Sequence, residues 1–247
     1  MGCSSLDRRI KSYEIKKDIS VMPGMFIITC LTGGTKEHYS FTAPFDERFR
    51  DYMVQTTEHL MNCGFKIIYG YTQSDEISLL FDYDEDSFAR KVRKLNSILA
   101  GEASAKFSTL LGGVGAFDCR LSAFPNKNLV IDYFRWRSED AHRNSLNAHC
   151  YWALRKAGYT KREATKRIEK ISVADKNELL YSQGINYNKL PAWQKRGIGL
   201  YWKETEKESI NPKTGEKVIA IRNRLYVDYE LPVKESYYKL IETILSK

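Results

Sequence analysis

The order of apolar segments in the first 134 residues restricts the fold of this chain more than any other property of the sequence. Short apolar runs bounded by glycine or polar turn residues predict strands, and apolar residues three or four positions apart predict helices. The predicted segments are a strand at Met25–Leu31, a helix at Phe45–Leu60, strands at Phe65–Tyr71 and Ile77–Tyr83, a helix from about Ser87, a strand at Ala116–Phe124 and an extended segment at Asn128–Phe134. This series predicts an α+β fold with the ferredoxin-like βαββαβ order.

The second half of the chain predicts a helical segment and then a β-hairpin. Ser138, followed by two acidic residues, has the composition of a helix start, because acids suit the positive end of a helix dipole. Thr160 has capping-box spacing to Glu163, and Ser172 is a candidate cap for a further helix. The predicted hairpin has arms at Ile198–Trp202 and Val218–Tyr229 and a turn at Asn211–Gly215.

The turn Ser74-Asp75-Glu76 is the sharpest chemical feature of the sequence. In a βαββαβ sheet the first strand lies beside the central hairpin, so residues after that strand meet the hairpin turn at one edge. Adjacent carboxylates at such an edge can hold a divalent cation that clamps phosphate oxygens. The alternative is a solvated acidic turn, because turns favour Asp and Ser for backbone reasons.

Charge and cysteine content narrow the class of protein. Lys and Arg outnumber Asp and Glu by 39 to 31, and this surplus favours a polyanionic partner, although many basic proteins bind no nucleic acid. The five cysteines are scattered without a CxxC pair, which argues against a zinc ribbon or a disulfide framework. No run approaches the roughly 20 apolar residues of a membrane span, and Leu6 departs from the myristoylation pattern. We therefore expect a cytoplasmic protein that does not enter a membrane.

Three further segments have both a functional and an ordinary interpretation. His142 and Asn144 would offer donors to a phosphate at a predicted helix start, or would simply face water there. Lys176 is a candidate counter-charge for phosphate, or part of a solvated helix face. The basic helix that contains Lys161 and Arg162 would follow an RNA backbone, or would form a charged exterior.

Several motifs, in this order and spacing, resemble the tRNAHis guanylyltransferase family from about Phe26 to Lys203. They are Tyr71-Thr72-Gln73-Ser74-Asp75-Glu76, Phe117-Asp118-Cys119-Arg120, Tyr133-Phe134-Arg135-Trp136-Arg137, His142-Arg143-Asn144, Ala174-Asp175-Lys176-Asn177-Glu178 and Gly184-Ile185-Asn186-Tyr187-Asn188. The resemblance implies a polymerase-type palm that activates the 5′ end of tRNA with ATP or GTP and then adds a nucleotide in the 3′→5′ direction. It further implies two Mg²⁺ ions and a homodimer or homotetramer bridged by tRNA.

The resemblance also implies roles for individual residues. The catalytic and metal-binding residues would be Asp75, Glu76 and Gly33. Nucleotide would be held by Ser74, Gly33, Gly34, His142, Asn144 and Lys176, and RNA by Arg137, Arg143, Lys161, Arg162 and Asn186. Residues 1–136 would form the palm-like catalytic domain, and residues 137–247 the helical part that contacts nucleotide and tRNA together with the hairpin, packed with the palm as one compact unit.

One motif departs from the family. The family reads Arg-Leu-Asp-Gly at the first strand, and its Asp is a metal ligand, whereas this chain has Cys30-Leu31-Thr32-Gly33. Ala43 also stands where the family often has Lys. A neutral hydroxyl cannot replace a bridging carboxylate, because Mg²⁺ prefers anionic oxygen ligands. Glu37 is a candidate replacement ligand, whereas Asp46 has the position of a helix cap.

Three functional hypotheses follow. The first is a nucleotidyltransferase that acts on tRNA 5′ ends, as the retained Ser74-Asp75-Glu76 turn suggests. The second is a catalytically impaired family member that binds tRNA or nucleotide without turnover, as Thr32 suggests. The third is a nucleotide cyclase or another palm enzyme, because the same strand order supports several chemistries.

Overall fold

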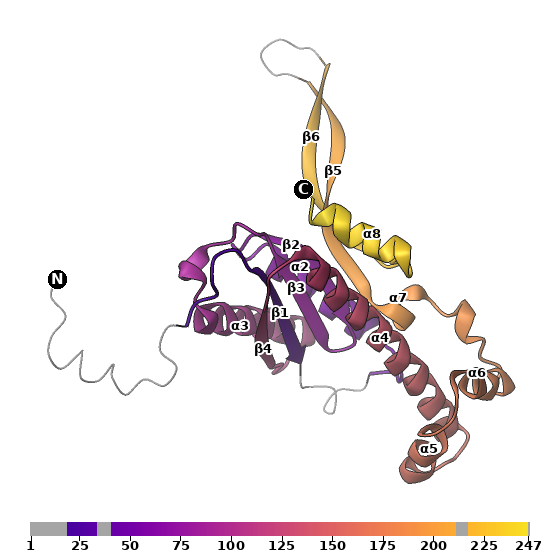
Figure 1. Cartoon of the computed structure of the whole chain (residues 1–247). Coiled ribbons are helices and arrows are strands. Elements are labelled where there is room, and N and C mark those ends of the chain that lie inside the picture. The colour runs from indigo at the N-terminus through magenta and orange to yellow at the C-terminus, as the bar shows by residue number, and fades with distance from the viewer. Residues whose placement is uncertain (1–18, 34–40, 211–216, 247) are drawn as a thin grey trace, which may run out of the picture.

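A computed structural model describes residues 19–33, 41–210 and 217–246. Its elements are β1 (Phe26–Gly33), α2 (Glu47–Met61), β2 (Ile67–Gln73), β3 (Glu76–Phe81), the 3₁₀ turn η2 (Ser87–Arg90), α3 (Val92–Leu111), β4 (Phe117–Phe124), α4 (Lys127–Lys156), α5 (Lys161–Ile168), α6 (Val173–Ser182), the 3₁₀ turn η3 (Tyr187–Lys189), α7 (Ala192–Arg196), β5 (Ile198–Ile210), β6 (Lys217–Asp228) and α8 (Glu235–Ile244). The strands form one antiparallel sheet in the order β4-β1-β3-β2-β5-β6 (Figure 1). The α+β class and the βαββαβ order of the first four strands are confirmed.

The sheet is covered on both faces because side chains on a strand alternate between them. Ile27 and Leu31 of β1 join the core under α2 and α3. Phe26 and Ile28 join a second core that includes residues of α4 and α8. Cys30 and Thr32 continue this second series, so they lie on the α4 face of the sheet.

The segment Asn128–Phe134 is not extended, and this prediction was wrong. It forms the first turns of α4, which Asn126 caps by accepting a hydrogen bond from the backbone N–H of Leu129 at 3.1 Å. Val130 and Phe134 are fully buried four residues apart, a helical spacing that fits the face of the sheet. Packing against the sheet therefore overrides the strand preference of the β-branched residues there. Ser138 consequently lies inside α4 and does not begin a helix.

The helix predicted from Ser87 begins later than expected. Ser87–Arg90 forms a 3₁₀ turn with φ values of 55°, 52° and 55° at Phe88, Ala89 and Arg90, and α3 starts at Val92. A long-range contact accounts for the difference, because the carbonyl of Arg90 accepts a hydrogen bond from the backbone N–H of Val21 at 3.0 Å. In a helix from Ser87, Phe88 would share one face with Leu95 and Leu99; it is instead 48% exposed, whereas those two are fully buried.

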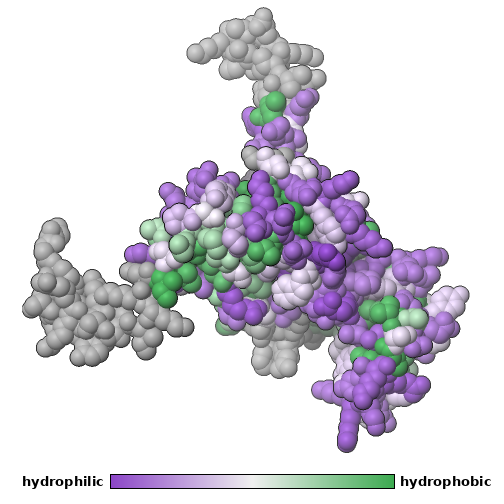
Figure 2. Space-filling view, viewed as in Figure 1, coloured by the Kyte–Doolittle hydropathy of each residue, from purple (hydrophilic) through white to green (hydrophobic). Residues whose placement is uncertain are grey.

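The capping boxes at Thr160 and Ser172 are both present and begin α5 and α6. These two short helices pack on the far end of α4, away from the sheet (Figure 1). Figure 2 shows apolar residues reaching the surface of this lobe, where Val173 and Tyr181 are exposed.

The C-terminal hairpin is confirmed, but β5 and β6 are long and project beyond the body of the molecule (Figure 1). The predicted turn at Asn211–Gly215 lies outside the described residues. Helix α8 was not foreseen; it buries Tyr237 and Ile241 beside α4. No helix in the described part of the chain is long and apolar enough to cross a membrane.

Candidate functional site

A cavity of about 660 Å³ lies where β1 ends and the β2–β3 hairpin turns. Its walls come from the end of β1, the segment that leads into α2, the hairpin tip, the middle of α4 and α7. The apolar part of the wall includes Phe45 and Trp193, whose ring centroids are 5.9 Å apart. Arg50 lies 4.9 Å from the Trp193 ring. An aromatic wall opposite a polar end suits a ligand with a flat ring and an anionic group.

The polar end of the cavity is the hairpin tip. Ser74 and Asp75 form the turn between β2 and β3, and Ser74 has a left-handed φ of 56°. The backbone N–H of Gly33 donates to the carbonyl of Asp75 at 2.8 Å and so holds the end of β1 against the tip. A Cβ at Gly33 would lie 2.9 Å from the Phe117 ring, so any larger residue there would force this ring to move. The predicted meeting of Gly33, Ser74, Asp75 and Glu76 at one edge of the sheet is present.

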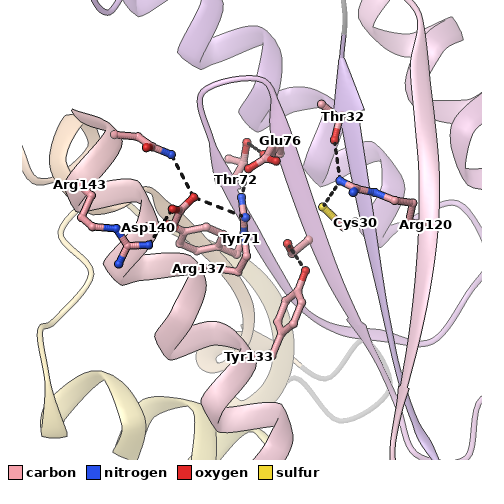
Figure 3. Close-up of polar contacts among 12 residues, drawn as sticks. Cys30, Thr32, Tyr71, Thr72, Glu76, Arg120, Tyr133, Arg137, Asp140 and Arg143 are labelled. Carbon is pink, nitrogen blue, oxygen red and sulfur yellow. Dashed lines mark hydrogen bonds and ion pairs between the residues drawn. The ribbon is translucent and has the colours of Figure 1, made fainter. Parts of the chain in front are cut away.

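Glu76 forms an ion pair with Arg137 of α4. Arg137 is buried, and its guanidinium also lies 3.9 Å from the carboxylate of Asp140. Asp140 in turn accepts hydrogen bonds from Arg143 at 2.9 Å and from the amide of Asn144 at 3.0 Å (Figure 3). A continuous polar network therefore connects the hairpin tip to α4, and a contact of Arg137 with RNA would require breaking it.

Thr32 pairs with Glu76 of β3 on one side and with Asp118 of β4 on the other. Its hydroxyl accepts a hydrogen bond from Arg120 at 3.4 Å, and the same Nη2 atom lies 3.9 Å from the Cys30 sulfur (Figure 3). Arg120 had no assigned role in the sequence, because its approach to Thr32 depends on the pairing register of β1 and β4. The alternation of residues along a strand can assign Arg120 to one face of β4, but it does not show which residue of the neighbouring strand lies beside it.

These residues do not fit the expected site for two Mg²⁺ ions. In the part of the chain that the structure describes, no three His, Cys, Asp or Glu side chains are grouped so as to hold a metal ion. Thr32 supplies a hydroxyl, Glu76 is paired with Arg137, and Arg120 adds positive charge beside Thr32. Mg²⁺ prefers anionic oxygen, and a guanidinium nearby opposes its binding. Asp46 caps α2, as expected, and Glu37 lies outside the described residues.

Several other predicted site residues do not line this cavity. His142 lies inside α4 rather than at a helix start, so the argument from a helix N-terminus was wrong; its Nδ1 atom faces the Tyr187 hydroxyl at 3.5 Å. The predicted nucleotide and RNA contacts on the α5–α6 side do not line the cavity either. They are Lys161, Arg162, Lys176 and Asn186. Gly34 lies outside the described residues. Only Asn144 of the predicted nucleotide contacts on α4 reaches the cavity wall.

The fold and the site together define a class: α+β proteins with a ferredoxin-like sheet, an acidic hairpin tip and a cavity between that tip and a long helix. Two family models match this chain, tRNAHis guanylyltransferase over residues 7–125 and the Thg1 C terminal domain over residues 128–236. The chain therefore belongs to the tRNAHis guanylyltransferase (Thg1) family, and the resemblance inferred from its motifs is confirmed.

Relatives and solved structures agree with this assignment. A probable tRNA(His) guanylyltransferase of Bos taurus is 30% identical over 236 residues, covering 87% of this chain and 79% of the relative. That of Drosophila melanogaster is 31% identical over 214 residues, covering 81% and 74%. A bacterial Thg1-like protein in complex with ATP superposes with a TM-score of 0.75 at 26% identity, covering 98% of this chain and 100% of the other. Its complex with GTP gives 0.74 and 27%, covering 99% and 100%.

Proposed function

We propose that this protein adds a nucleotide to the 5′ end of tRNA in the 3′→5′ direction after activation of that end by ATP or GTP. The observation that carries the proposal is the cavity, which joins an aromatic wall to the polar hairpin tip in a chain of this family. The sheet then serves as a polymerase-type palm. The ATP and GTP complexes of the bacterial Thg1-like protein support a nucleoside triphosphate as the ligand.

The walls of the cavity suggest how the ligand lies. The base would stack near Phe45 and Trp193, because flat rings prefer such apolar surfaces. The phosphates would then reach the tip at Ser74 and Asp75, with Asn144 as a donor from α4. The positively charged side chains of α4 and α5 that we expect to contact RNA are Arg143, Lys161 and Arg162. The roles expected for His142 and Lys176 stay predictions.

A second candidate function is a family member that binds tRNA or nucleotide without turnover. The observation that favours it is the replacement of a carboxylate by Thr32 together with the pairing of Glu76 and Arg137. The nucleotide cyclase alternative is less favoured, because both family models match the RNA-extending family.

We also propose that the protein is cytoplasmic and forms a homodimer or homotetramer. Cell fractionation would test the compartment, and light scattering would test the oligomeric state.

The first two functions are separated by incorporation of labelled GTP into 5′-monophosphorylated and 5′-truncated tRNA in the presence of ATP and Mg²⁺. Product that is lost in Asp75→Ala and kept in Asp84→Ala supports nucleotidyl transfer, since Asp84 is an exposed turn residue outside the cavity. Binding of tRNA without product supports the second function. Product only in a Thr32→Asp variant means that the fold is retained and the chemistry is switched off at position 32.

A further inference from the structure

Position 32 lies on the α4 face near the end of β1, between two carboxylate-bearing neighbours in register. Glu76 pairs with it from β3 and Asp118 from β4. A carboxylate at this position would add a third negative charge to the row. The hydroxyl of Thr32 adds none, and it also lines the cavity. Without a carboxylate at position 32, the site lacks the additional negative charge that would help to bind a second divalent cation.

A protein-borne cation already lies at this position. Arg120 pairs with Cys30 across the strands, two residues before Thr32 and therefore on the same face. Its Nη2 atom is 3.4 Å from the Thr32 hydroxyl, and its two hydrogen-bond partners in the described part of the chain, Thr32 and Cys30, are neutral. The guanidinium therefore approaches the cavity through Thr32, which lines it, and its positive charge is not cancelled by these two partners (Figure 3).

A second guanidinium completes the arrangement on the other side of Thr32. Arg137 is buried and pairs with Glu76, so the carboxylate next in register is neutralised by the protein itself. A divalent cation in phosphoryl chemistry neutralises phosphate oxygens, and a guanidinium can do the same through two parallel hydrogen bonds.

We propose that Arg120 supplies at Thr32 the positive charge that a second divalent cation would otherwise provide, so that the triphosphate is bound with one divalent ion at most. This inference rests on the nucleotide binding in the proposed function. It predicts that ATP and GTP remain bound when divalent ions are removed.

The test counts bound Mn²⁺ by electron paramagnetic resonance in the presence of saturating ATP and measures ATP affinity by calorimetry with Mn²⁺ or with EDTA. We expect no more than one Mn²⁺ per chain in the unaltered protein and binding of ATP in EDTA. Arg120→Ala weakens ATP binding in EDTA by roughly ten- to a hundredfold, the range for loss of a charge-assisted hydrogen bond, and Arg120→Lys restores part of it. Arg222→Ala, an exposed arginine of β6 far from the cavity, is the matched control and binds ATP normally.

A double variant tests the exchange of charge directly. Thr32→Asp combined with Arg120→Ala restores the carboxylate and removes the cation, so we expect a second bound Mn²⁺. Two Mn²⁺ ions in the unaltered protein, loss of its ATP binding in EDTA, or normal binding by Arg120→Ala would each overturn the inference while leaving the proposed function intact. Absence of ATP and GTP binding in both buffers would instead overturn the proposed function, and the inference with it.

Discussion

The ion pair between Glu76 and Arg137 allows a quantitative test of how the hairpin tip is held. Arg137→Met keeps most of the side-chain volume but removes the charge, leaving Glu76 and Asp140 without the guanidinium that lies between them. Breaking a buried pair by removing one partner costs about 3–5 kcal/mol. The Arg137 side chain is only 6% exposed, but those of Glu76 and Asp140 are 28% and 26% exposed, so water recovers part of this cost.

We therefore expect Arg137→Met to lower the free energy of unfolding by about 2–3 kcal/mol, below the fully buried range. For a chain of this size this corresponds to a decrease in Tm of roughly 5–10 °C. Urea denaturation followed by circular dichroism measures the first quantity, and a thermal scan measures the second. ATP affinity measured on the same samples reports whether the hairpin tip also loses its position.

The matched control is Glu76→Gln combined with Arg137→Met. Because the double variant removes the stranded charge of Glu76, it should be more stable than Arg137→Met alone, with a coupling of about 1 kcal/mol or more. A loss below about 0.5 kcal/mol in Arg137→Met, the range of ordinary surface changes, would show that the pair contributes nothing to stability and would refute this reasoning.

Three further outcomes are expected. Gly33→Ala places a Cβ 2.9 Å from the Phe117 ring, so it should lower Tm and weaken ATP binding together; unchanged values in a thermal-shift titration would contradict the close packing. Ser172→Ala removes the capping box with Asp175 and should cost about 1 kcal/mol in urea unfolding, whereas an unchanged midpoint would mean that α6 needs no cap. Burial lowers the pKa of His149 to about 4, so the unfolded chain takes up this proton first and stability should fall as the pH drops from about 6.5 towards 4. His149→Gln should flatten that dependence in pH-resolved unfolding, and an identical slope would assign it to other groups.

The hairpin tip could be predicted from the sequence because it depends on local patterns. Alternating and uninterrupted apolar runs define β1, β2 and β3, and the βαββαβ order then brings Gly33 beside Asp75. The caps at Thr160 and Ser172 follow from fixed spacing in the chain. Each of these features needs only neighbouring residues or the order of elements.

The features that were missed depend on contacts between distant segments. The start of α4 is set by Val130 and Phe134 packing on the sheet, which competes with their preference for strands. The contact of Arg120 with Thr32 follows from the pairing register of two strands separated by most of the palm. The burial of Arg137 against Glu76 required both α4 and the hairpin to be in place. Periodicity within one element contains none of this information.

Helix α4 has a consequence for how the chain can change in length. It is continuous over 30 residues, or about 45 Å, with Val130 and Phe134 on the sheet and Leu146 and Cys150 in the small core of the α5–α6 lobe. A residue inserted between Phe134 and Leu146 would turn the lobe by about 100° around the helix axis relative to the sheet. Lengthening by about seven or eleven residues would nearly restore the orientation, because these are close to whole numbers of turns. The helix thus sets the rotational relation between its two ends, and a single insertion there would change it.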